Sequence, residues 1–232
     1  MFKTLIFTAT YNESENVKKL IPLINKSYKN ADILIIDDNS PDGTANTIQN
    51  LSKKIKNIKL IRRDKKKGLD TAHKLAFKYA KLHKYDFFIT MDADLSHQPK
   101  EIPKIIRLLK NSPFVIGSRY IKGGSCQMSL PRLMLSLVGN KIIKLVLGIS
   151  CNEFTTSYRG FNLKLISKFD MKNIKSKGYS FFLETIFQIN RYYEIKEIPI
   201  QFMNRVSGVS KIPKVEILRT LKNIFILKFF KN

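Results

Sequence analysis

The amino-acid sequence predicts a single α/β domain with a mostly parallel central sheet, followed by amphipathic C-terminal helices. Short apolar segments alternate with helical patterns along the first two-thirds of the chain, which is the pattern of repeated βαβ units. The chain has 232 residues, of which 44% are hydrophobic, enough for one sizeable core. No linker-like stretch divides it. We therefore expect the main domain over 1–210. A basic amphipathic helix over 211–232 either belongs to that domain or contacts a membrane.

Two kinds of periodicity place the individual elements. Apolar runs bounded by polar residues predict strands, and apolar side chains three or four positions apart predict helices. In chain order we expect strands at 5–10, 32–36, 58–62, 86–91 and 114–117, alternating with helices at 14–28, 44–55, 69–83 and 101–110. After residue 117 we expect a broken amphipathic stretch at 130–149, a strand at 195–202 and a final amphipathic helix at 215–230.

The charge of the chain is strongly positive, with 42 Lys and Arg against 18 Asp and Glu and a formal net charge of +24. Such a charge predicts anionic partners: nucleic acids, anionic lipids or phosphorylated small molecules. The basic residues are spread along the chain, and its richness in Lys, Asn and Ile is also typical of AT-rich coding. A nucleic-acid-binding protein would show clustered Lys and Arg with stacking aromatic residues in a known module. We find no such module and expect no nucleic-acid partner.

Cysteine, histidine and membrane signals are sparse. The two cysteines have no metal-like spacing and the three histidines lie far apart, which disfavours a histidine-based metal site or a Ser–His–Asp triad. No uncharged apolar run reaches the ~18 residues that span a membrane, and the N-terminus has no signal-peptide pattern. We expect a protein without a transmembrane helix that is cytoplasmic or peripheral on the cytoplasmic face of a membrane.

Polar clusters follow four of the predicted strands. They comprise residues 10–13, 37–43, 92–94 and 118–120. In an open α/β sheet, ligands bind beyond the carboxyl ends of the strands. One cluster alone is compatible with a surface turn, but four on the same edge of one sheet predict a binding site.

The sharpest signal is Asp92-Ala93-Asp94, which directly follows a fully apolar strand. Side chains two positions apart in an extended chain point the same way, and two carboxylates so placed repel each other unless a cation lies near them. Mg²⁺ prefers oxygen ligands and keeps positions for water and substrate phosphates, and Mn²⁺ shares this preference for oxygen. The alternative is a surface turn with two solvated acids. The position at a strand end favours a site for Mg²⁺ or Mn²⁺ that also holds a diphosphate.

Other polar residues at this edge suit a nucleotide. Asp38 can accept hydrogen bonds from a ribose or a base, while residues 41–44 shape the loop. Arg119 can bind phosphate through two parallel N–H groups, or be an ordinary surface arginine. Near the C-terminus, Arg205 and Lys211 belong to a glycine-containing loop that can close over a diphosphate.

These motifs resemble those of family 2 glycosyltransferases with the GT-A fold, and most of all the polyprenyl (dolichyl) phosphate mannose synthases. The matching stretches span nearly the whole chain. They are TYNESEN from Thr10, DDNSPDGT from Asp37, MDADLSHQP from Met91, IGSRYIKGG from Ile116 and FMNRVSGVSK from Phe202. The resemblance implies a GT-A domain over 1–210. It also implies an inverting, metal-dependent transfer of a hexose, mannose from GDP-mannose, to a polyprenyl or dolichyl phosphate.

The resemblance also implies roles for individual residues. The nucleoside side would be formed by Ala9, Tyr11, Glu13, Ile36, Asp38, Asp92 and Ala93. The metal, Mg²⁺ or Mn²⁺, would be held by Asp92, Asp94 and Ser96. The acceptor phosphate would face Arg119 and Arg132, and the donor diphosphate would be covered by Arg205 and Lys211. The catalytic groups would thus be Asp94, Arg119, Arg205 and Lys211, with Glu153 as general base if the acceptor is a hydroxyl.

One stretch departs from the family pattern. Relatives commonly carry Asp-x-Thr-Ser-Gly-Phe-Arg where this chain has Glu-Phe-Thr-Thr-Ser-Tyr-Arg at 153–159. That loop lies near the sugar and the acceptor in relatives. The resemblance therefore leaves open another nucleotide sugar, such as UDP-glucose, or a glycan hydroxyl as the acceptor. An inactive relative that serves as a scaffold is disfavoured by the intact pair of Asp92 and Asp94.

The resemblance implies contact with a membrane surface as well. In relatives the stretch after Gly124 contains amphipathic helices at the membrane surface, and residues 130–149 fit that pattern. Some relatives add transmembrane helices. We expect none here, so that the protein reaches lipid through its own amphipathic surface or through a membrane-anchoring partner protein.

Overall fold

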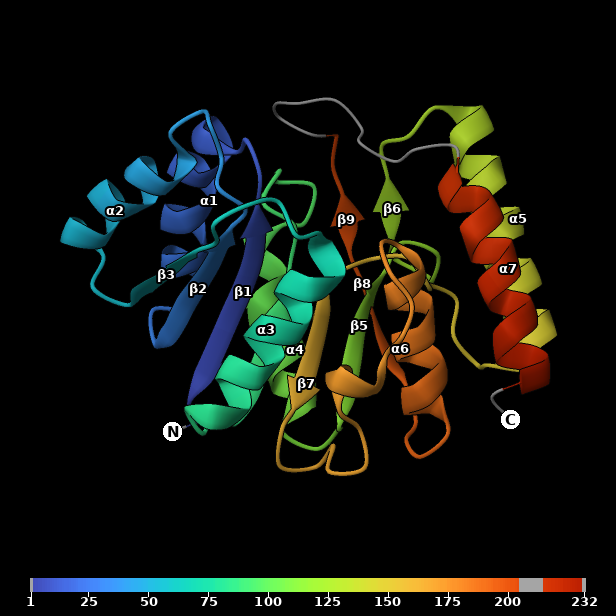
Figure 1. The fold of residues 1–232 in the computed structure, drawn as a ribbon. Helices are drawn as coiled ribbons and strands as arrows, with labels where there is room; N and C mark the ends of the chain where they lie inside the picture. The colour runs from blue at the N-terminus through green and yellow to red at the C-terminus, as the bar shows by residue number, and fades with distance from the viewer. Residues whose placement is uncertain (1, 205–214, 231–232) are drawn as a thin grey trace.

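The computed structural model describes residues 2–204 and 215–230 and has three layers, with helices on both faces of one central sheet (Figure 1). The seven strands lie in the order β3-β2-β1-β4-β7-β5-β8. They are β1 (Thr4–Thr10), β2 (Ala31–Asp37), β3 (Ile58–Arg62), β4 (Phe87–Thr90), β5 (Phe114–Ser118), β7 (Arg159–Asn162) and β8 (Lys196–Pro199). A second sheet pairs β6 (Ser125–Cys126) with β9 (Gln201–Phe202). The predicted fold class is confirmed.

The helices follow the predicted order, with one addition. They are α1 (Ser14–Ser27), α2 (Thr44–Lys54), α3 (Leu69–Leu82), α4 (Ile102–Leu109), α5 (Leu130–Leu147), α6 (Ser180–Asn190) and α7 (Val215–Phe230). The stretch expected to be broken at 130–149 is the continuous helix α5, because Lys and Arg are good helix formers and do not interrupt it. The sequence did not predict α6, in which almost every residue is buried, the polar Ser180, Glu184 and Thr185 included, so that it has no broad exposed polar face.

The main difference from the prediction is β7, which runs antiparallel between β4 and β5. All other neighbours in this sheet are parallel. β7 has only four residues, among them Arg159 and Gly160, and shows no alternation that would predict a strand. The single strand expected at 195–202 is also wrong. It is divided into β8 and β9, which belong to different sheets.

The central strands are buried on both faces, so each contributes to two cores. Leu5 and Phe7 of β1 face the first core, which is covered by α3 and α6. Ile6 faces the second core, which is covered by α1 and α4. Leu227 of α7 belongs to the first core and is fully buried. The C-terminal helix therefore packs on the same domain, while the boundary expected at 210–211 lies outside the described residues.

Helices α5 and α7 lie side by side at one end of the sheet (Figure 1). We use the term apolar surface for their exposed apolar side chains. These are Leu130, Met134, Leu135, Leu137, Val138, Ile142, Leu145 and Val146 on α5, and Leu221, Phe225 and Phe229 on α7. The same helices expose the basic residues Arg132, Lys141, Arg219, Lys222 and Lys228. Within the described part of the chain, no helix combines the length and apolar character needed to cross a membrane.

Gly160 marks a close contact between β7 and α4. A Cβ atom there would lie 2.5 Å from Cγ2 of Ile105 and 2.8 Å from Cδ1 of Leu109. We expect Gly160→Ala to lower the free energy of unfolding by about 1–3 kcal/mol, because overpacking forces buried side chains to shift. The control is Gly139→Ala on α5, where an added Cβ meets no atom within 4 Å. Denaturant titration measures both variants, and equal unfolding midpoints would contradict the packing of β7 beneath α4.

Candidate active site

The carboxyl ends of β1, β2, β4 and β5 meet at one edge of the sheet, the upper edge in Figure 1, as predicted. The loops after β1, β2 and β4 each contain a non-glycine residue with positive φ: Asn12 at 59°, Asn39 at 56° and Leu95 at 63°. Asparagine tolerates this conformation, but leucine rarely adopts it. Backbone strain of this kind concentrates at functional sites, and here it lies beside Asp94.

The two aspartates at the end of β2 hold neighbouring loops together. Asp37 is fully buried and accepts a hydrogen bond from Oγ1 of Thr10 at 2.8 Å. Asp38 forms a buried ion pair with Arg63 and accepts a hydrogen bond from the backbone N–H of Lys67 at 3.1 Å. Asp37 thus joins the ends of β1 and β2, and Asp38 joins the loops that follow β2 and β3.

The other residues expected on the nucleoside side lie along the same part of the edge. Tyr11 is half-buried, and Nζ of Lys66 lies 4.0 Å from the centroid of its ring. Glu13 is half-buried at the start of α1. Ile36 pairs with Ala9 and is fully buried in the core. A bound nucleoside would therefore meet the main chain of Ile36 rather than its side chain.

The structure brings Asp92, Asp94 and Ser96 together in the loop after β4. Asp92 is about a third exposed, and its Oδ1 accepts a hydrogen bond from Oγ of Ser157 at 2.5 Å. Asp94 is buried, and its Oδ1 accepts hydrogen bonds from the backbone N–H and Oγ of Ser96 at 3.1 and 2.6 Å. Ala93 between them is buried. The hydrogen bonds between Asp94 and Ser96 therefore hold the loop after β4. The side chain of Asp92 is partly exposed to solvent.

These two carboxylates fit a divalent cation whose coordination is completed by a substrate. Among the described residues, no three His, Cys, Asp or Glu side chains are grouped to hold a metal by themselves. Mg²⁺ sites that act on phosphates commonly use one or two carboxylates, with water and the phosphates as further ligands. Within 2–204 and 215–230, Oδ2 of Asp92 accepts no hydrogen bond, so this oxygen is available to a cation.

His97 joins the Asp92 loop to the loop before β7. It is fully buried, and its Nδ1 accepts the backbone N–H of Asp92 at 3.0 Å, so Nδ1 carries no proton. Nε2 then carries the proton and donates to Oγ1 of Thr156 at 3.0 Å. Burial lowers the pKa of His97 in spite of the nearby charges of Asp92 and Asp94. The ring is therefore neutral at pH 7, and it positions the backbone of a candidate metal ligand.

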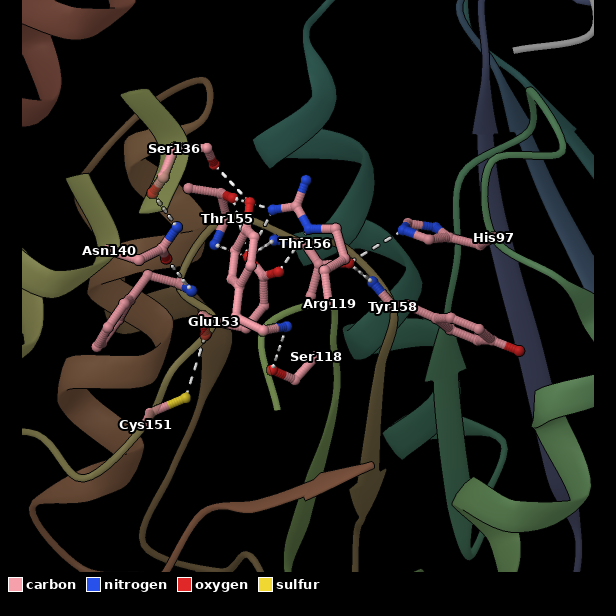
Figure 2. A network of polar contacts seen from close by, with 12 residues as sticks. His97, Ser118, Arg119, Ser136, Asn140, Cys151, Glu153, Thr155, Thr156 and Tyr158 are labelled. Atoms are coloured by element: carbon pink, nitrogen blue, oxygen red, sulfur yellow. Dashed lines mark hydrogen bonds and ion pairs between the residues drawn. The ribbon is translucent and has the colours of Figure 1, made fainter. Parts of the chain in front are cut away.

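Arg119, after β5, forms a buried two-pronged ion pair with Glu153 in the loop before β7 (Figure 2). Nε and Nη2 of Arg119 donate to the two carboxylate oxygens at 2.6 and 2.7 Å, and Nη2 also donates to Oγ1 of Thr155 at 2.8 Å. Burial raises the pKa of Glu153, but the Arg119 charge and hydrogen bonds from Thr155 outweigh it and hold this pKa below its usual value. A carboxylate so paired is a weak base, which disfavours the general-base role expected for Glu153.

One nitrogen of Arg119 remains for another anion. Its guanidinium lies 4.9 Å from the ring centroid of Tyr120 and 5.0 Å from that of Phe202. Within the described residues, Nη1 has no hydrogen-bond partner, and Figure 2 shows it pointing away from Glu153. Arg132 lies exposed on the first turn of α5. The role expected for Arg119 at a phosphate is thus compatible with its geometry.

Arg205 and Lys211 both lie outside the described residues. Just before this segment, the backbone N–H of Met203 donates to the carbonyl of Ser96 at 3.0 Å. The described chain therefore runs beside the Asp94 loop as far as this point.

Three residues that complete the site were not predicted: His97, Ser157 and Asn140. His97 lies inside the motif MDADLSHQP, one of the stretches that resemble the family. No pattern in the sequence indicated that this histidine connects Asp92 to Thr156. Ser157 replaces the glycine of the family pattern, and its hydroxyl bonds Asp92. Asn140 is a buried polar residue of α5, and its Oδ1 accepts the N–H of Phe154 at 2.9 Å.

The family model of glycosyl transferase family 2 matches residues 5–169, which contain every strand end described above and also Glu153. The chain therefore belongs to glycosyl transferase family 2.

Within this family, the chain is similar to two proteins over nearly its whole length. The undecaprenyl-phosphate mannosyltransferase of Micrococcus luteus is 31% identical over 212 residues, covering 90% of this chain and 87% of that protein. The polyprenol monophosphomannose synthase of Mycolicibacterium smegmatis is 32% identical over 214 residues, covering 90% of this chain and 81% of that protein. Both names describe mannose joined to a polyprenyl phosphate.

Solved structures agree in fold. The mannosyltransferase PcManGT of Pyrobaculum calidifontis, in complex with GDP-Man and Mn²⁺, has a TM-score of 0.63 at 13% identity, covering 99% of this chain and 64% of that one. Glucosyl-3-phosphoglycerate synthase of Mycobacterium tuberculosis, with Mn²⁺, UDP and glucosyl-3-phosphoglycerate, has a TM-score of 0.68 at 11% identity, covering 98% and 80%. These matches confirm the GT-A type of fold.

The hydroxyl of Ser157 should contribute to metal binding through Asp92. Groups that hydrogen-bond a ligating side chain fix its orientation, and losing one commonly weakens metal binding by roughly 10-fold or more. We expect Ser157→Ala to raise the dissociation constant for Mn²⁺, measured by calorimetry with GDP present, by about 10-fold. The control is Ser112→Ala, which removes another buried hydroxyl just before β5. Equal Mn²⁺ affinity in both variants would contradict this role.

Proposed function

We propose that the chain transfers mannose from GDP-mannose to a polyprenyl phosphate, with a divalent cation held at Asp92 and Asp94. The observation that carries this proposal is the buried pair of Arg119 and Glu153. Glu153, the expected general base, is paired with Arg119 and is therefore a weak base. Arg119 in turn is suited to bind an anionic acceptor.

Sequence similarity supports the sugar and the acceptor. The two relatives whose names describe mannose transfer to polyprenyl phosphate match 90% of this chain at 31 and 32% identity. The mannosyltransferase solved with GDP-Man and Mn²⁺ shares the fold at much lower identity. Its bound donor and cation are compatible with the carboxylate pair found here.

The donor side is formed by the loops after β1, β2 and β4. A divalent cation bound at Asp92 and Asp94 supplies positive charge that makes the nucleoside diphosphate a better leaving group. Asp92 is held by Ser157 and, through its backbone, by His97. This support fixes the carboxylate before substrate binds, which is the arrangement that stabilises developing charge. Arg205 and Lys211 remain candidates for contacts to the diphosphate.

The acceptor side favours an oxygen that is already anionic. In a one-step displacement with inversion, a phosphate oxygen forms the new bond to the anomeric carbon while the bond to the diphosphate oxygen breaks. A phosphate oxygen needs no base for this step, whereas a hydroxyl does. Glu153 has a lowered pKa and both oxygens bonded to Arg119. His97 is buried with both ring nitrogens bonded. A glycan hydroxyl is therefore the less favoured acceptor.

The apolar surface of α5 and α7 suits contact with a membrane. A polyprenyl phosphate keeps its hydrocarbon chain in the bilayer, so its phosphate must be met at the membrane surface. Exposed apolar side chains can insert at that surface, and each nearby Lys or Arg adds about 1 kcal/mol of attraction to anionic lipids. We propose peripheral binding through this surface, with a membrane-anchoring partner protein as a further means of attachment.

The proposed reaction is tested by transfer of label into lipid. Purified protein is incubated with Mg²⁺ or Mn²⁺, a short polyprenyl phosphate and, in parallel, labelled GDP-mannose, UDP-glucose or UDP-N-acetylglucosamine. We expect label in the organic phase from GDP-mannose alone, and its loss when a chelator removes the metal. Asp94→Asn should lower the rate by about 100-fold or more, because an isosteric amide removes the charge that holds the cation.

The control for Asp94→Asn is Asp86→Asn. Asp86 lies just before β4, at the opposite end of the strand that leads to Asp94, and is bonded to Lys3 and Lys164. It should keep full activity. Lipid label from a UDP-sugar would overturn the proposed donor, and nucleotide binding without lipid label from any donor would overturn the proposed acceptor. Full activity of Asp94→Asn would overturn the metal site.

Membrane binding is tested with two leucines of equal exposure. Leu145 on α5 and Leu82 at the end of α3 are both 71% exposed. We expect Leu145→Glu to weaken co-sedimentation with anionic vesicles by about 10-fold, because burying such a side chain contributes about 1.5–3 kcal/mol. Leu82→Glu changes the net charge equally and should bind like the unmodified protein. Equal losses in the two variants would show that binding depends on charge alone and not on the apolar surface.

A further inference from the structure

One side of α5 carries polar residues that face the candidate active site. Ser136, Asn140 and Lys144 are spaced four apart and therefore share one face of the helix. Ser136 Oγ lies 2.6 Å from Oη of Tyr120, and Nζ of Lys144 donates to Oδ1 of Asn152 at 2.9 Å. This polar face is directed toward the sheet, while the apolar surface of the same helix is exposed.

Asn140 makes the most consequential of these contacts (Figure 2). It is buried, its Oδ1 accepts the backbone N–H of Phe154 at 2.9 Å, and its Nδ2 donates to the carbonyl of Ser136 at 2.7 Å. Phe154 directly follows Glu153, whose carboxylate holds Arg119 in two places. A displacement of α5 would therefore move the peptide that carries the carboxylate.

A second contact ties the other partner of the ion pair to the same helix. Tyr120 directly follows Arg119, and the guanidinium lies 4.9 Å from the centroid of the tyrosine ring. Because the Tyr120 hydroxyl bonds Ser136, α5 holds both the arginine side and the glutamate side of the pair.

We propose that Asn140 is a positioning residue for the acceptor. Through the peptide of Phe154 and the carboxylate of Glu153, it sets the place of the Arg119 guanidinium. The acceptor side of the site is thus built on α5 as well as on the sheet, and the helix that exposes the apolar surface also determines whether Arg119 can meet a phosphate. This inference rests on the proposed transfer to a polyprenyl phosphate.

A purely structural role for Asn140 makes a different prediction. If Asn140 only docks α5 on the domain, its loss should affect the binding of donor and acceptor alike. The candidate donor residues that the structure describes lie after β1, β2 and β4, and Asn140 forms no hydrogen bond with these described residues. A positioning role therefore confines the effect to the acceptor.

The test compares steady-state kinetics for both substrates. We expect Asn140→Ala to raise KM for a short polyprenyl phosphate, or lower kcat/KM for it, by roughly 10- to 100-fold, because a small misplacement of a binding group has effects of this size. KM for GDP-mannose and the dissociation constant of GDP with Mn²⁺ should stay within about 2-fold. Gly139→Ala is the control on the same helix, since an added Cβ there meets no atom within 4 Å.

Three further comparisons separate positioning from loss of fold. Asn140→Gln keeps both the amide oxygen for the N–H of Phe154 and the amide N–H for the carbonyl of Ser136, without a new charge, and should recover part of the acceptor affinity. In an Arg119→Lys background the two-pronged contact to Glu153 is already lost. There Asn140→Ala should raise the acceptor KM little further, because the effects of two substitutions that act through the same contact are not additive. Ser136→Ala, which removes only the contact to Tyr120, should shift the acceptor KM in the same direction by a smaller factor.

The outcomes distinguish this inference from the proposed function. An unmodified protein that transfers no mannose to polyprenyl phosphate overturns the proposed function and this inference with it. An active protein in which Asn140→Ala leaves the acceptor KM unchanged overturns the inference alone. Equal losses for donor and acceptor, or effects of Asn140→Ala and Arg119→Lys that simply multiply, also overturn it. For each variant, far-UV circular dichroism at the assay temperature shows that the fold is retained, and the dissociation constant of GDP with Mn²⁺ shows that the donor side is intact.

Discussion

The buried ion pair of Arg119 and Glu153 connects the sheet, the loop before β7 and helix α5. Removing both charges from water costs several kcal/mol per ion, and only good geometry with further hydrogen bonds offsets that cost. Glu153 meets this condition, because it accepts two N–H groups from Arg119 and further hydrogen bonds from the backbone of Thr155 and Thr156 at 3.0 and 3.2 Å. Loss of one partner would leave a buried charge and cost about 3–5 kcal/mol. The loop therefore has one stable arrangement.

The reversed strand β7 explains why this loop reaches the active site. In a purely parallel sheet, only the segments after the strands meet at the carboxyl edge. Because β7 runs antiparallel between β4 and β5, the segment before it arrives at the same edge. Arg159 at its start is fully buried and donates to the carbonyls of Phe154, Thr156 and Phe182. Burial lowers the pKa of Arg159 to about 9, so the side chain stays charged at pH 7. Its hydrogen bonds to the carbonyls of Phe154 and Thr156 hold the loop before β7 in place.

The sequence alone predicted the parts of the site that are local in the chain. Asp92 and Asp94 were found because a fully apolar strand leads directly into them. β7 was missed because a four-residue strand with Arg159 and Gly160 has no periodicity, and α6 because it is buried on almost all sides. The state of Glu153 depends on Arg119, which is 34 positions earlier in the chain. No local pattern reveals such a partner, so a sequence can nominate a base but cannot show that its pKa is lowered.

Helix α5 departs from the usual arrangement of a surface helix. A helix on a water-soluble domain normally buries its apolar side and exposes its polar side. In α5 the polar residues Ser136 and Asn140 face the domain, while apolar residues such as Leu135 and Leu145 are exposed. Apolar residues therefore occur almost all around the helix, and the charged residues Arg132, Lys141 and Lys144 interrupt them. An exposed apolar side of this kind is compatible with the proposed membrane contact, while the inward hydrogen bonds of Ser136 and Asn140 fix the position of α5 on the domain. If α5 contacts a membrane as proposed, its two sides meet two different demands: the outer side contacts lipid, and the inner side positions Arg119.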